Sequence, residues 1–247
     1  MLNTPSLDKL REMKITAMAD AWVEQNQDPG IGQLSFDERM GFLVDAEHLA
    51  RHNRKLTSLL RKAQLRISAA CIEDVDCSST RGLAKATLRQ LAPCGWIAEH
   101  NNIVVTGATG VGKTYVSCAL AQQACRKGYK TLYRRVPRLF DEVTLARADG
   151  TWPRLLQQLA RTDLLVLDDW GLVNLNAAKR NDLLEILDDR EGLRSTIVTS
   201  QLPHGSWHEH IGDPTVADAI LDRVLHNAYK IELTGPSRRK EKTTKAS

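Results

Sequence analysis

Hydrophobic and polar positions follow two different patterns along this chain of 247 residues. From residue 101 onward, short apolar runs alternate with longer stretches in which apolar residues recur every three or four positions. The predicted strands are residues 103–106, 130–135, 164–167, 195–200 and 229–233, and the predicted helices are 114–126, 137–148, 177–191 and 216–225. This alternation predicts an α/β fold, a parallel sheet flanked by helices, over residues 101–235.

Residues 1–76 have hardly any strand pattern and predict a small all-α N-terminal domain for binding DNA or a partner. A first amphipathic helix is expected up to a break at residues 28–30, and Ser35 with Glu38 has the form of a capping box that opens a second helix. We interpret Phe36 and Phe42 in that second helix as core residues. Residues 77–100 predict a linker and a lead-in helix, and residues 236–247 predict a basic, disordered tail.

The polar face of the second helix is strongly basic and contains no acid between residues 51 and 66. Two interpretations stay open, a solvated helix face or a surface that binds duplex or phosphate. The same two apply to three arginines that flank the end of the strand at 130–135. The candidate DNA-binding residues are Arg51, Arg54, Lys55, Arg61, Lys62, Arg66, Arg134, Arg135 and Arg138. A net charge of +4 permits nucleic acid as a partner without requiring it.

Composition narrows the remaining possibilities. Hydrophobic residues make up 42% and charged residues 26% of the chain, as in a globular protein. The five cysteines form no C-x-x-C pair, and the His-rich residues 204–210 lack further ligands, so neither a zinc site nor a disulfide framework is expected. No apolar stretch reaches membrane length and no signal peptide is visible, so we expect a cytoplasmic protein without membrane contact.

Residues 107–114 form a complete G-x-x-x-x-G-K-[ST] phosphate-binding loop between a predicted strand and a predicted helix. Glycines let backbone N–H groups curl around a polyphosphate, and the following helix N-terminus adds partial positive charge. Lys113 is expected to reach the β- and γ-phosphates, and the Thr114 hydroxyl to bind Mg²⁺. The predicted nucleotide-binding residues are Gly107, Ala108, Thr109, Gly110, Val111, Gly112, Lys113 and Thr114. The chain is therefore predicted to bind a nucleoside triphosphate.

A second motif supports this site. The apolar run at residues 164–167 ends in Asp168 and Asp169, as in a buried parallel strand whose carboxyl end opens onto a ligand. Asp168 is the candidate Mg²⁺ ligand, since a hard cation prefers carboxylate oxygen. Asp169 is the candidate that polarises a water for attack on the γ-phosphate. Two adjacent acids favour hydrolysis of the nucleotide over binding alone.

Two further positions suit a nucleotide hydrolase. The strand at 195–200 leads into Ser200 and Gln201, polar side chains that can orient water and sense the γ-phosphate, with Gln201 the first candidate. Arg223, on the helix at 216–225, can be projected across a subunit boundary to stabilise charge on a neighbour's nucleotide. A plain strand exit and a surface cation are the alternative interpretations of these residues.

The order of these motifs resembles the AAA+ ATPases of the DnaC/IstB group. Three stretches are most similar to the IstB-like helper ATPases of bacterial transposons: Arg81-Gly82-Leu83, Asp-Asp-Trp-Gly at 168–171, and Asp189-Arg190 leading to Thr-Ser-Gln-Leu-Pro at 199–203. The resemblance covers nearly the whole chain.

The resemblance implies an oligomeric ATPase that assembles with ATP and Mg²⁺ on double-stranded DNA and helps a transposase select and insert at its target. It implies that Lys113 and Thr114 bind ATP and Mg²⁺, that Asp168 and Asp169 activate hydrolysis, and that Arg223 acts in trans at an ATP site between subunits. Two departures concern the sensors. Gln201 stands where many AAA+ proteins have Asn, and only Arg238 and Arg239 are available as a second sensor.

Three other functions compete with this one. A DnaC-like replicative helicase loader shares every ATPase motif but would grip a helicase and favour single strands, for which residues 1–76 offer few stacking aromatics. A small-molecule kinase needs an acceptor pocket and a lid, and little chain remains after residue 233 to build a lid. A nucleotide-gated scaffold that scarcely hydrolyses is the third.

Overall fold

The computed structural model describes residues 4–238, so most of the predicted tail, including Arg239, lies outside the described residues. The chain divides into two compact units between Ser58 and Leu59. This division falls before the predicted boundary at residue 76, because Ala70, Ile72 and Val75 pack into the core of the second unit. Each unit is described by itself.

The first unit is helical. It contains α1 (Thr4–Glu12), α2 (Thr16–Gln25), a 3₁₀ turn (Pro29–Gln33) and most of α3 (Phe36–Ala63). The single helix predicted before residue 28 is two helices, because Lys14 takes a left-handed φ of 61° between them. The capping box at the start of α3 is confirmed, since the Ser35 N–H donates to the Glu38 carboxylate (2.8 Å) and the Glu38 N–H to the Ser35 hydroxyl (3.3 Å).

Glu47 organises this unit and partly neutralises the basic helix. Its carboxylate accepts the N–H groups of Ala17 (3.0 Å) and Met18 (3.2 Å) in the first turn of α2. It also pairs with Arg51 (2.7 Å) and Arg54 (3.2 Å), one and two turns further along α3. The basic face therefore does have an acid beside it, supplied from just outside the window 51–66. The interpretation of Phe36 and Phe42 as core residues is wrong, because Phe36 is 73% and Phe42 59% exposed.

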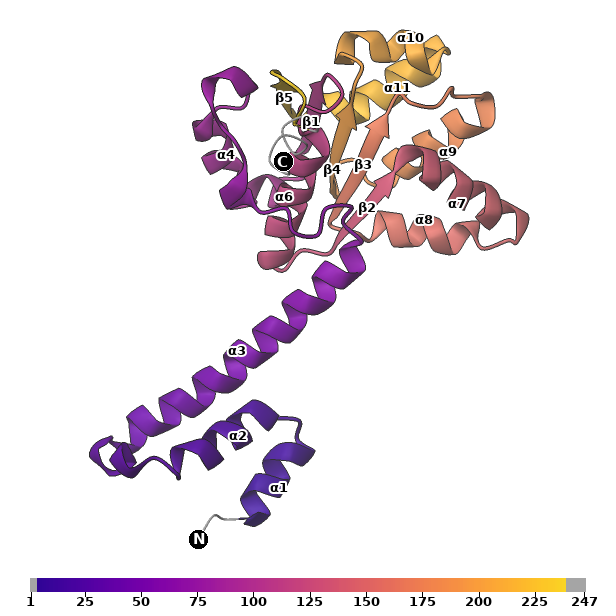
Figure 1. Ribbon diagram of the computed structural model, residues 1–247. Coiled ribbons are helices and arrows are strands. Elements are labelled where there is room, and N and C mark those ends of the chain that lie inside the picture. Colours follow the sequence, from indigo (N-terminus) through magenta and orange to yellow (C-terminus); the bar gives the residue numbers. More distant parts are fainter. Residues whose placement is uncertain (1–3, 239–247) are drawn as a thin grey trace, which may run out of the picture. The chain divides into compact units, whose positions relative to one another are not determined.

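The second unit is built on a five-stranded parallel sheet with the order β2-β3-β4-β1-β5 (Figure 1). The strands are β1 (Asn102–Gly107), β2 (Thr131–Arg135), β3 (Leu164–Trp170), β4 (Ser195–Ser200) and β5 (Ala228–Leu233). The predicted parallel α/β sheet is confirmed. All carboxyl ends of the strands lie along one edge, which is where ligands bind in such sheets.

Helices cover both faces of the sheet (Figure 1). They are α4 (Lys85–Leu91), α5 (Gly95–Ala98), α6 (Lys113–Arg126), α7 (Val136–Ala148), α8 (Trp152–Ala160), α9 (Ala177–Asp188), α10 (Trp207–Ile211) and α11 (Pro214–Leu225). Three further 3₁₀ turns are Ile72–Asp74, Ser79–Arg81 and His204–Ser206. The predicted lead-in helix is two helices, since Cys94 has a φ of 63°. Helices α8 and α10 were not predicted.

The alternation of side chains along each strand separates two cores. Ile103 and Val105 pack with α6 and the segment before β1, whereas Val104 packs with α7 to α11 on the opposite face. Cys118 and Cys125, seven residues apart, are both buried on α6. Within residues 4–238, no helix is long and apolar enough to cross a bilayer. The same residues hold no cluster of three or more His, Cys, Asp or Glu side chains suited to a metal ion.

Candidate functional site

The phosphate-binding loop connects the carboxyl end of β1 to the first turn of α6. Gly112 caps α6 with a φ of 108°, a value that L side chains rarely adopt. Gly107, at the other end of the loop, has no room for a side chain, because a Cβ there would lie 2.2 Å from the Leu233 carbonyl oxygen. The Lys113 ammonium donates to the carbonyl oxygens of Gly107 (2.8 Å) and Ala108 (2.9 Å). The loop is therefore closed around its own lysine.

Asp168 lies at the end of β3 and is fully buried. Its carboxylate accepts hydrogen bonds from three hydroxyls, those of Thr114 (3.0 Å), Tyr133 (2.5 Å) and Thr199. Burial, and then the Asp168 carboxylate, raise the pKa of Tyr133. The phenol therefore stays protonated and donates to Asp168 at neutral pH. These donors come from α6, β2 and β4, so three elements fix the position of one carboxylate.

Asp169 adopts a left-handed φ of 65°, next to an irregularity in the pairing of β3 with β4 between Leu167 and Trp170. A bulge of this kind redirects the side chain at the edge of a sheet. The Asp169 N–H donates to the Thr199 hydroxyl (3.2 Å), which keeps the turned backbone in place. The carboxylate pairs with Arg135 (2.8 Å) and Arg66 (3.5 Å). Asp169 is thus held between two guanidinium groups.

The two sensor candidates differ in where they point. The Thr109 hydroxyl of the phosphate loop donates to the Gln201 side-chain carbonyl (2.5 Å). The buried Ser200 hydroxyl donates to the Trp170 carbonyl (2.9 Å) and accepts the Leu202 N–H (3.0 Å), so it fixes the turn after β4. Gln201 is therefore the residue of the two that lies beside the loop.

A cavity of about 620 Å³ joins these elements. It is lined by Thr109, Gly110, Gly112, Lys113 and Thr114 of the loop and by Arg66, Arg135, Asp169, Gln201 and Arg238. Its size suits a nucleotide. Arg66 was not predicted to line this cavity, because the basic pattern of residues 51–66 predicted that the helix continues through residue 66. Helix α3 ends at Ala63 and Gln64 has a φ of 53°, which turns the chain toward the cavity.

Arg238, one of the two second-sensor candidates, lies beside the phosphate loop. Its backbone N–H donates to the Gly110 carbonyl (3.0 Å), and its guanidinium pairs with Asp76. The Ser78 backbone N–H, with Arg238, lowers the pKa of Asp76 to about 2. Arg81 also contacts Asp76 (3.2 Å) and donates to the Pro236 carbonyl (3.0 Å). These contacts hold the segment after β5 against the loop.

Arg223 lies at the opposite edge of the sheet, where its carbonyl accepts a hydrogen bond from the Asn102 side chain at the start of β1. Its guanidinium pairs with Asp188 and with Glu191 (3.3 Å), and its pocket includes Asn102, the first residue of β1. The phosphate loop begins at the other end of β1, about 17 Å away at 3.3 Å per residue. Arg223 therefore does not reach the phosphate loop of its own chain.

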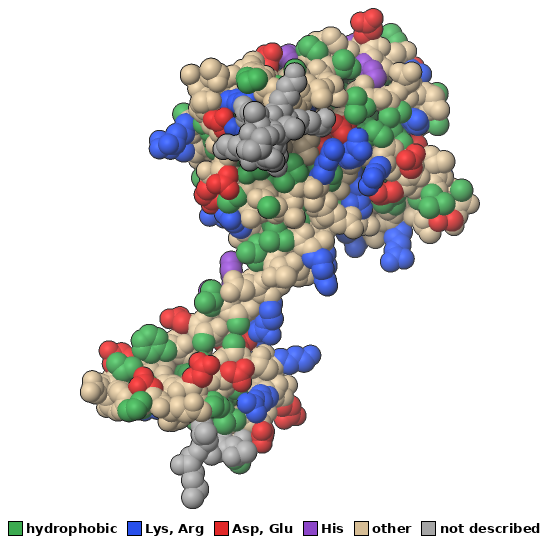
Figure 2. Space-filling model, viewed as in Figure 1, with side chains coloured by type: hydrophobic (Ala, Val, Ile, Leu, Met, Phe, Trp, Pro, Cys, Tyr) green, Lys and Arg blue, Asp and Glu red, His purple; other side chains and the backbone are tan. Residues whose placement is uncertain are grey.

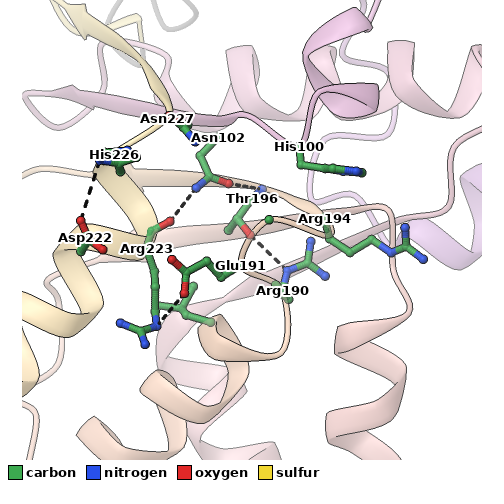
Figure 3. Close-up of a pocket in the computed structure, with 12 residues that line it drawn as sticks. His100, Asn102, Arg190, Glu191, Arg194, Thr196, Asp222, Arg223, His226 and Asn227 are labelled. Atoms are coloured by element: carbon green, nitrogen blue, oxygen red, sulfur yellow. Dashed lines mark hydrogen bonds and ion pairs between the residues drawn. The ribbon is translucent and has the colours of Figure 1, made fainter.

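Arg190 is a buried residue beside Arg223 whose role the sequence did not reveal (Figure 3). Its guanidinium donates to the carbonyls of Leu159, Thr162 and Ser195 and to the Thr196 hydroxyl. Burial lowers the pKa of Arg190 to about 9, so the group is charged at pH 7. It joins α8 and β4 to the turn after α9, which contains Glu191 and directly follows Asp188.

The described residues suit a magnesium nucleotide. One carboxylate, Asp168, and one hydroxyl, Thr114, lie within 3.0 Å of each other beside the loop. Magnesium is commonly held by one or two carboxylates together with phosphate oxygens and water, so a cluster of three acids is not needed. The lysine, the loop N–H groups and this oxygen pair provide what a phosphate chain and its cation require.

The other candidate DNA-binding residues occupy two places. Lys55, Arg61 and Lys62 are exposed on α3. Arg134 and Arg135 end β2, and Arg138 lies in the first turn of α7. The His-rich residues 204–210 form a 3₁₀ turn and most of α10 instead of a surface loop; His208 faces Asp218 (3.3 Å) and His210 faces the Val173 carbonyl (3.2 Å).

A phosphate loop and an acid-tipped strand on this strand order define a P-loop ATPase fold of the AAA+ class. Solved structures agree: the chain resembles DnaI (TM-score 0.58, 25% identity, 72% of this chain and 94% of that one). It also resembles the DnaC helicase loader (TM-score 0.56, 18% identity, 67% and 97%).

Residues 8–246 match the family described as IstB-like ATP binding protein, and the chain belongs to this family. It is 50% identical over 246 residues to the insertion sequence ATP-binding protein y4pL of Sinorhizobium fredii, covering 100% of both chains. It is 47% identical over 203 residues to the IS1162 ATP-binding protein of Pseudomonas fluorescens, covering 82% of this chain and 88% of that one. The predicted family is confirmed.

Proposed function

We propose that this protein is an ATP hydrolase that assembles with ATP on double-stranded DNA and assists a transposase in target selection and DNA insertion. One observation carries the ATPase part. Lys113 and Thr114 of α6, Asp168 and Asp169 of β3, and Gln201 after β4 converge from three segments of the chain at one edge of the sheet. That edge is where a nucleotide binds in parallel α/β folds.

The residues divide the chemistry among them. Lys113 and the loop N–H groups bind the phosphates, and Thr114 with Asp168 holds Mg²⁺, which neutralises charge on the phosphate oxygens. Asp169 accepts a proton from the attacking water once its arginine partners release it. Gln201 and Thr109 lie where water and the γ-phosphate are sensed. Ser200 serves this site by fixing the turn that presents Gln201.

Arg223 completes a second subunit's site in this proposal. Because Arg223 lies far from the phosphate loop of its own chain, we propose that it acts on the nucleotide of a neighbouring subunit. Asp188 and Glu191 pair with the guanidinium at the surface of the unit, where 23% of the Arg223 side chain is exposed. The functional form is then a homo-oligomer with ATP sites at its subunit interfaces.

The insertion-sequence relatives support transposition over the runner-up, a DnaC-like helicase loader. The likeness to the helicase loaders supports the shared fold, whereas relatives at 50% and 47% identity carry insertion-sequence names. A transposase is accordingly the partner we propose, in the cytoplasm. The exposed cations Lys55, Arg61 and Lys62 are the candidates on α3 for duplex contact.

Sedimentation velocity tests this function. The wild type is mixed with linear duplex and a non-hydrolysable ATP analogue, and each component is omitted in turn. The proposal predicts large complexes that form only when both nucleotide and duplex are present. It also predicts that Lys113→Ala does not form them. A persistent monomer that ignores duplex but binds a replicative helicase would favour the loader instead.

A further inference from the structure

A second cavity, of about 520 Å³, lies beside the nucleotide cavity at the carboxyl end of β2. Four arginines line it: Arg66, Arg134, Arg135 and Arg138. Arg66 and Arg135 also line the nucleotide cavity, so the two cavities share part of their walls. Figure 2 shows Lys and Arg side chains gathered on the surface of this unit near α7. The basic cavity therefore adjoins the nucleotide cavity, which is also lined by Asp169.

The four guanidinium groups are occupied to different degrees. Arg134 pairs with Glu142 (2.9 Å) and donates to the Gln64 side chain (2.6 Å). Arg135 and Arg66 both contact Asp169, and Arg66 also lies 3.7 Å from Asp168. Arg138 is exposed and makes no ion pair with any residue in the range 4–238. The cluster thus carries more positive charge than its three carboxylates balance.

The lining selects the class of anion. Guanidinium forks match phosphate oxygens, and several forks around one cavity favour phosphate over a single carboxylate. A nucleotide base would need an aromatic surface to stack on. Among the described residues, Tyr133 is the only aromatic that lines this cavity, and it is 6% exposed and bonded to Asp168. The cavity therefore suits a backbone phosphate of DNA, which carries no base information.

We propose that Arg66, Arg134, Arg135 and Arg138 bind one DNA backbone phosphate, and that this phosphate withdraws Arg66 and Arg135 from Asp168 and Asp169. This inference rests on the proposed ATPase that assembles on duplex DNA, and it deepens that proposal by locating the coupling between DNA and hydrolysis. In the absence of DNA, the two arginines hold the carboxylates that are needed for Mg²⁺ and for water activation. A DNA phosphate competes for the same guanidinium groups and frees those carboxylates.

Coupling of this kind is reciprocal. If DNA at the basic cavity makes the carboxylates available to Mg²⁺ and ATP, then the bound nucleotide makes the arginines available to DNA to the same degree. The ATP requirement for assembly on duplex and the stimulation of hydrolysis by duplex then have one cause. Both depend on Arg66 and Arg135 exchanging carboxylate partners for a phosphate.

Arg138→Ala tests the phosphate site, with Arg154→Ala as the matched control. Arg154 is likewise exposed and without an ion pair in the described part of the chain, but it lies on α8 away from the cavity. With the ATP analogue present, Arg138→Ala is expected to bind duplex roughly tenfold more weakly, with a salt slope lower by about one. The stimulation of its ATP hydrolysis by duplex is expected to fall severalfold.

Arg135→Gln tests the release of Asp169. Without DNA, its turnover number is expected to rise above that of the wild type, and the ratio of turnover with and without duplex is expected to shrink. A fall in the DNA-free turnover would overturn the release mechanism. Equal duplex affinity for Arg138→Ala and Arg154→Ala would overturn the phosphate site alone. A wild type that does not bind duplex at all would overturn both the site and the proposed function.

Discussion

Replacing Arg190 with Met tests how the edge of the sheet that carries Arg223 is held. The change keeps an unbranched side chain but removes the donors to three buried carbonyls and one buried hydroxyl. Each acceptor left unpaired costs about 1–3 kcal/mol. Removing a buried charge returns several kcal/mol of desolvation. We therefore expect a net loss of about 3–5 kcal/mol in the free energy of unfolding.

Thermal unfolding followed by near-ultraviolet circular dichroism measures this loss in the second unit, which contains Arg190. Trp170 and Trp207 are buried in the second unit with ring centroids 5.2 Å apart, so their signal follows its core. At roughly 2–4 °C per kcal/mol, Arg190→Met is expected to lower the Tm by about 10 °C.

The control is Arg194→Met, whose side chain is 39% exposed and lies 3.8 Å from Asp163. It should change the free energy of unfolding by less than about 1 kcal/mol. Below the Tm, the ATP affinity of Arg190→Met should stay within about twofold of the wild type, since the ATP site and Arg190 lie at opposite ends of the strands. A Tm equal to that of Arg194→Met would refute the reasoning.

Three further substitutions concern the nucleotide site. Lys113→Ala should weaken ATP binding about 10- to 100-fold in a fluorescent-nucleotide titration, because a charge-assisted contact to phosphate is lost. Asp169→Asn should keep ATP affinity and assembly but slow phosphate release about 10²- to 10⁴-fold, and equal turnover would exclude it as the base. Tyr133→Phe should cost about 1–3 kcal/mol in urea unfolding with ATP absent, and an unchanged midpoint would mean that its bond to Asp168 contributes nothing.

Local patterns predicted the sheet well because each strand is a continuous apolar run next to turn residues. All five strands lie within two or three residues of their predicted bounds, and the strand-to-helix context of the phosphate loop is as expected. The unpredicted helix α8 did have a signal: Trp152, Leu155, Leu156 and Leu159 recur at helical spacing after Thr151. The spacing of these four residues is therefore enough to predict α8.

Other features depend on contacts between distant segments, which no local pattern reports. Glu47 reaches Arg51 and Arg54 from just outside the window that looked free of acids. Arg66 contacts Asp169 across 103 residues of chain only because α3 ends at Ala63. The exposure of Phe36 and Phe42 likewise depends on which face of α3 packs on α2. Apolar residues lie all around α3, so the sequence pattern does not predict which face is buried.

A mixing experiment tests the central claim, that ATP is hydrolysed between subunits with Arg223 supplied in trans. Asp169→Asn, which keeps ATP affinity and assembly, has an inactive nucleotide site and an intact Arg223, whereas Arg223→Ala has the reverse. Each alone is expected to be inactive in phosphate release with Mg²⁺ and duplex. Mixed in equal amounts, they should recover about a quarter of wild-type activity, because half of the sites are intact and half of those adjoin an intact arginine. A mixture as inactive as its components, although sedimentation shows that they co-assemble, would contradict the claim.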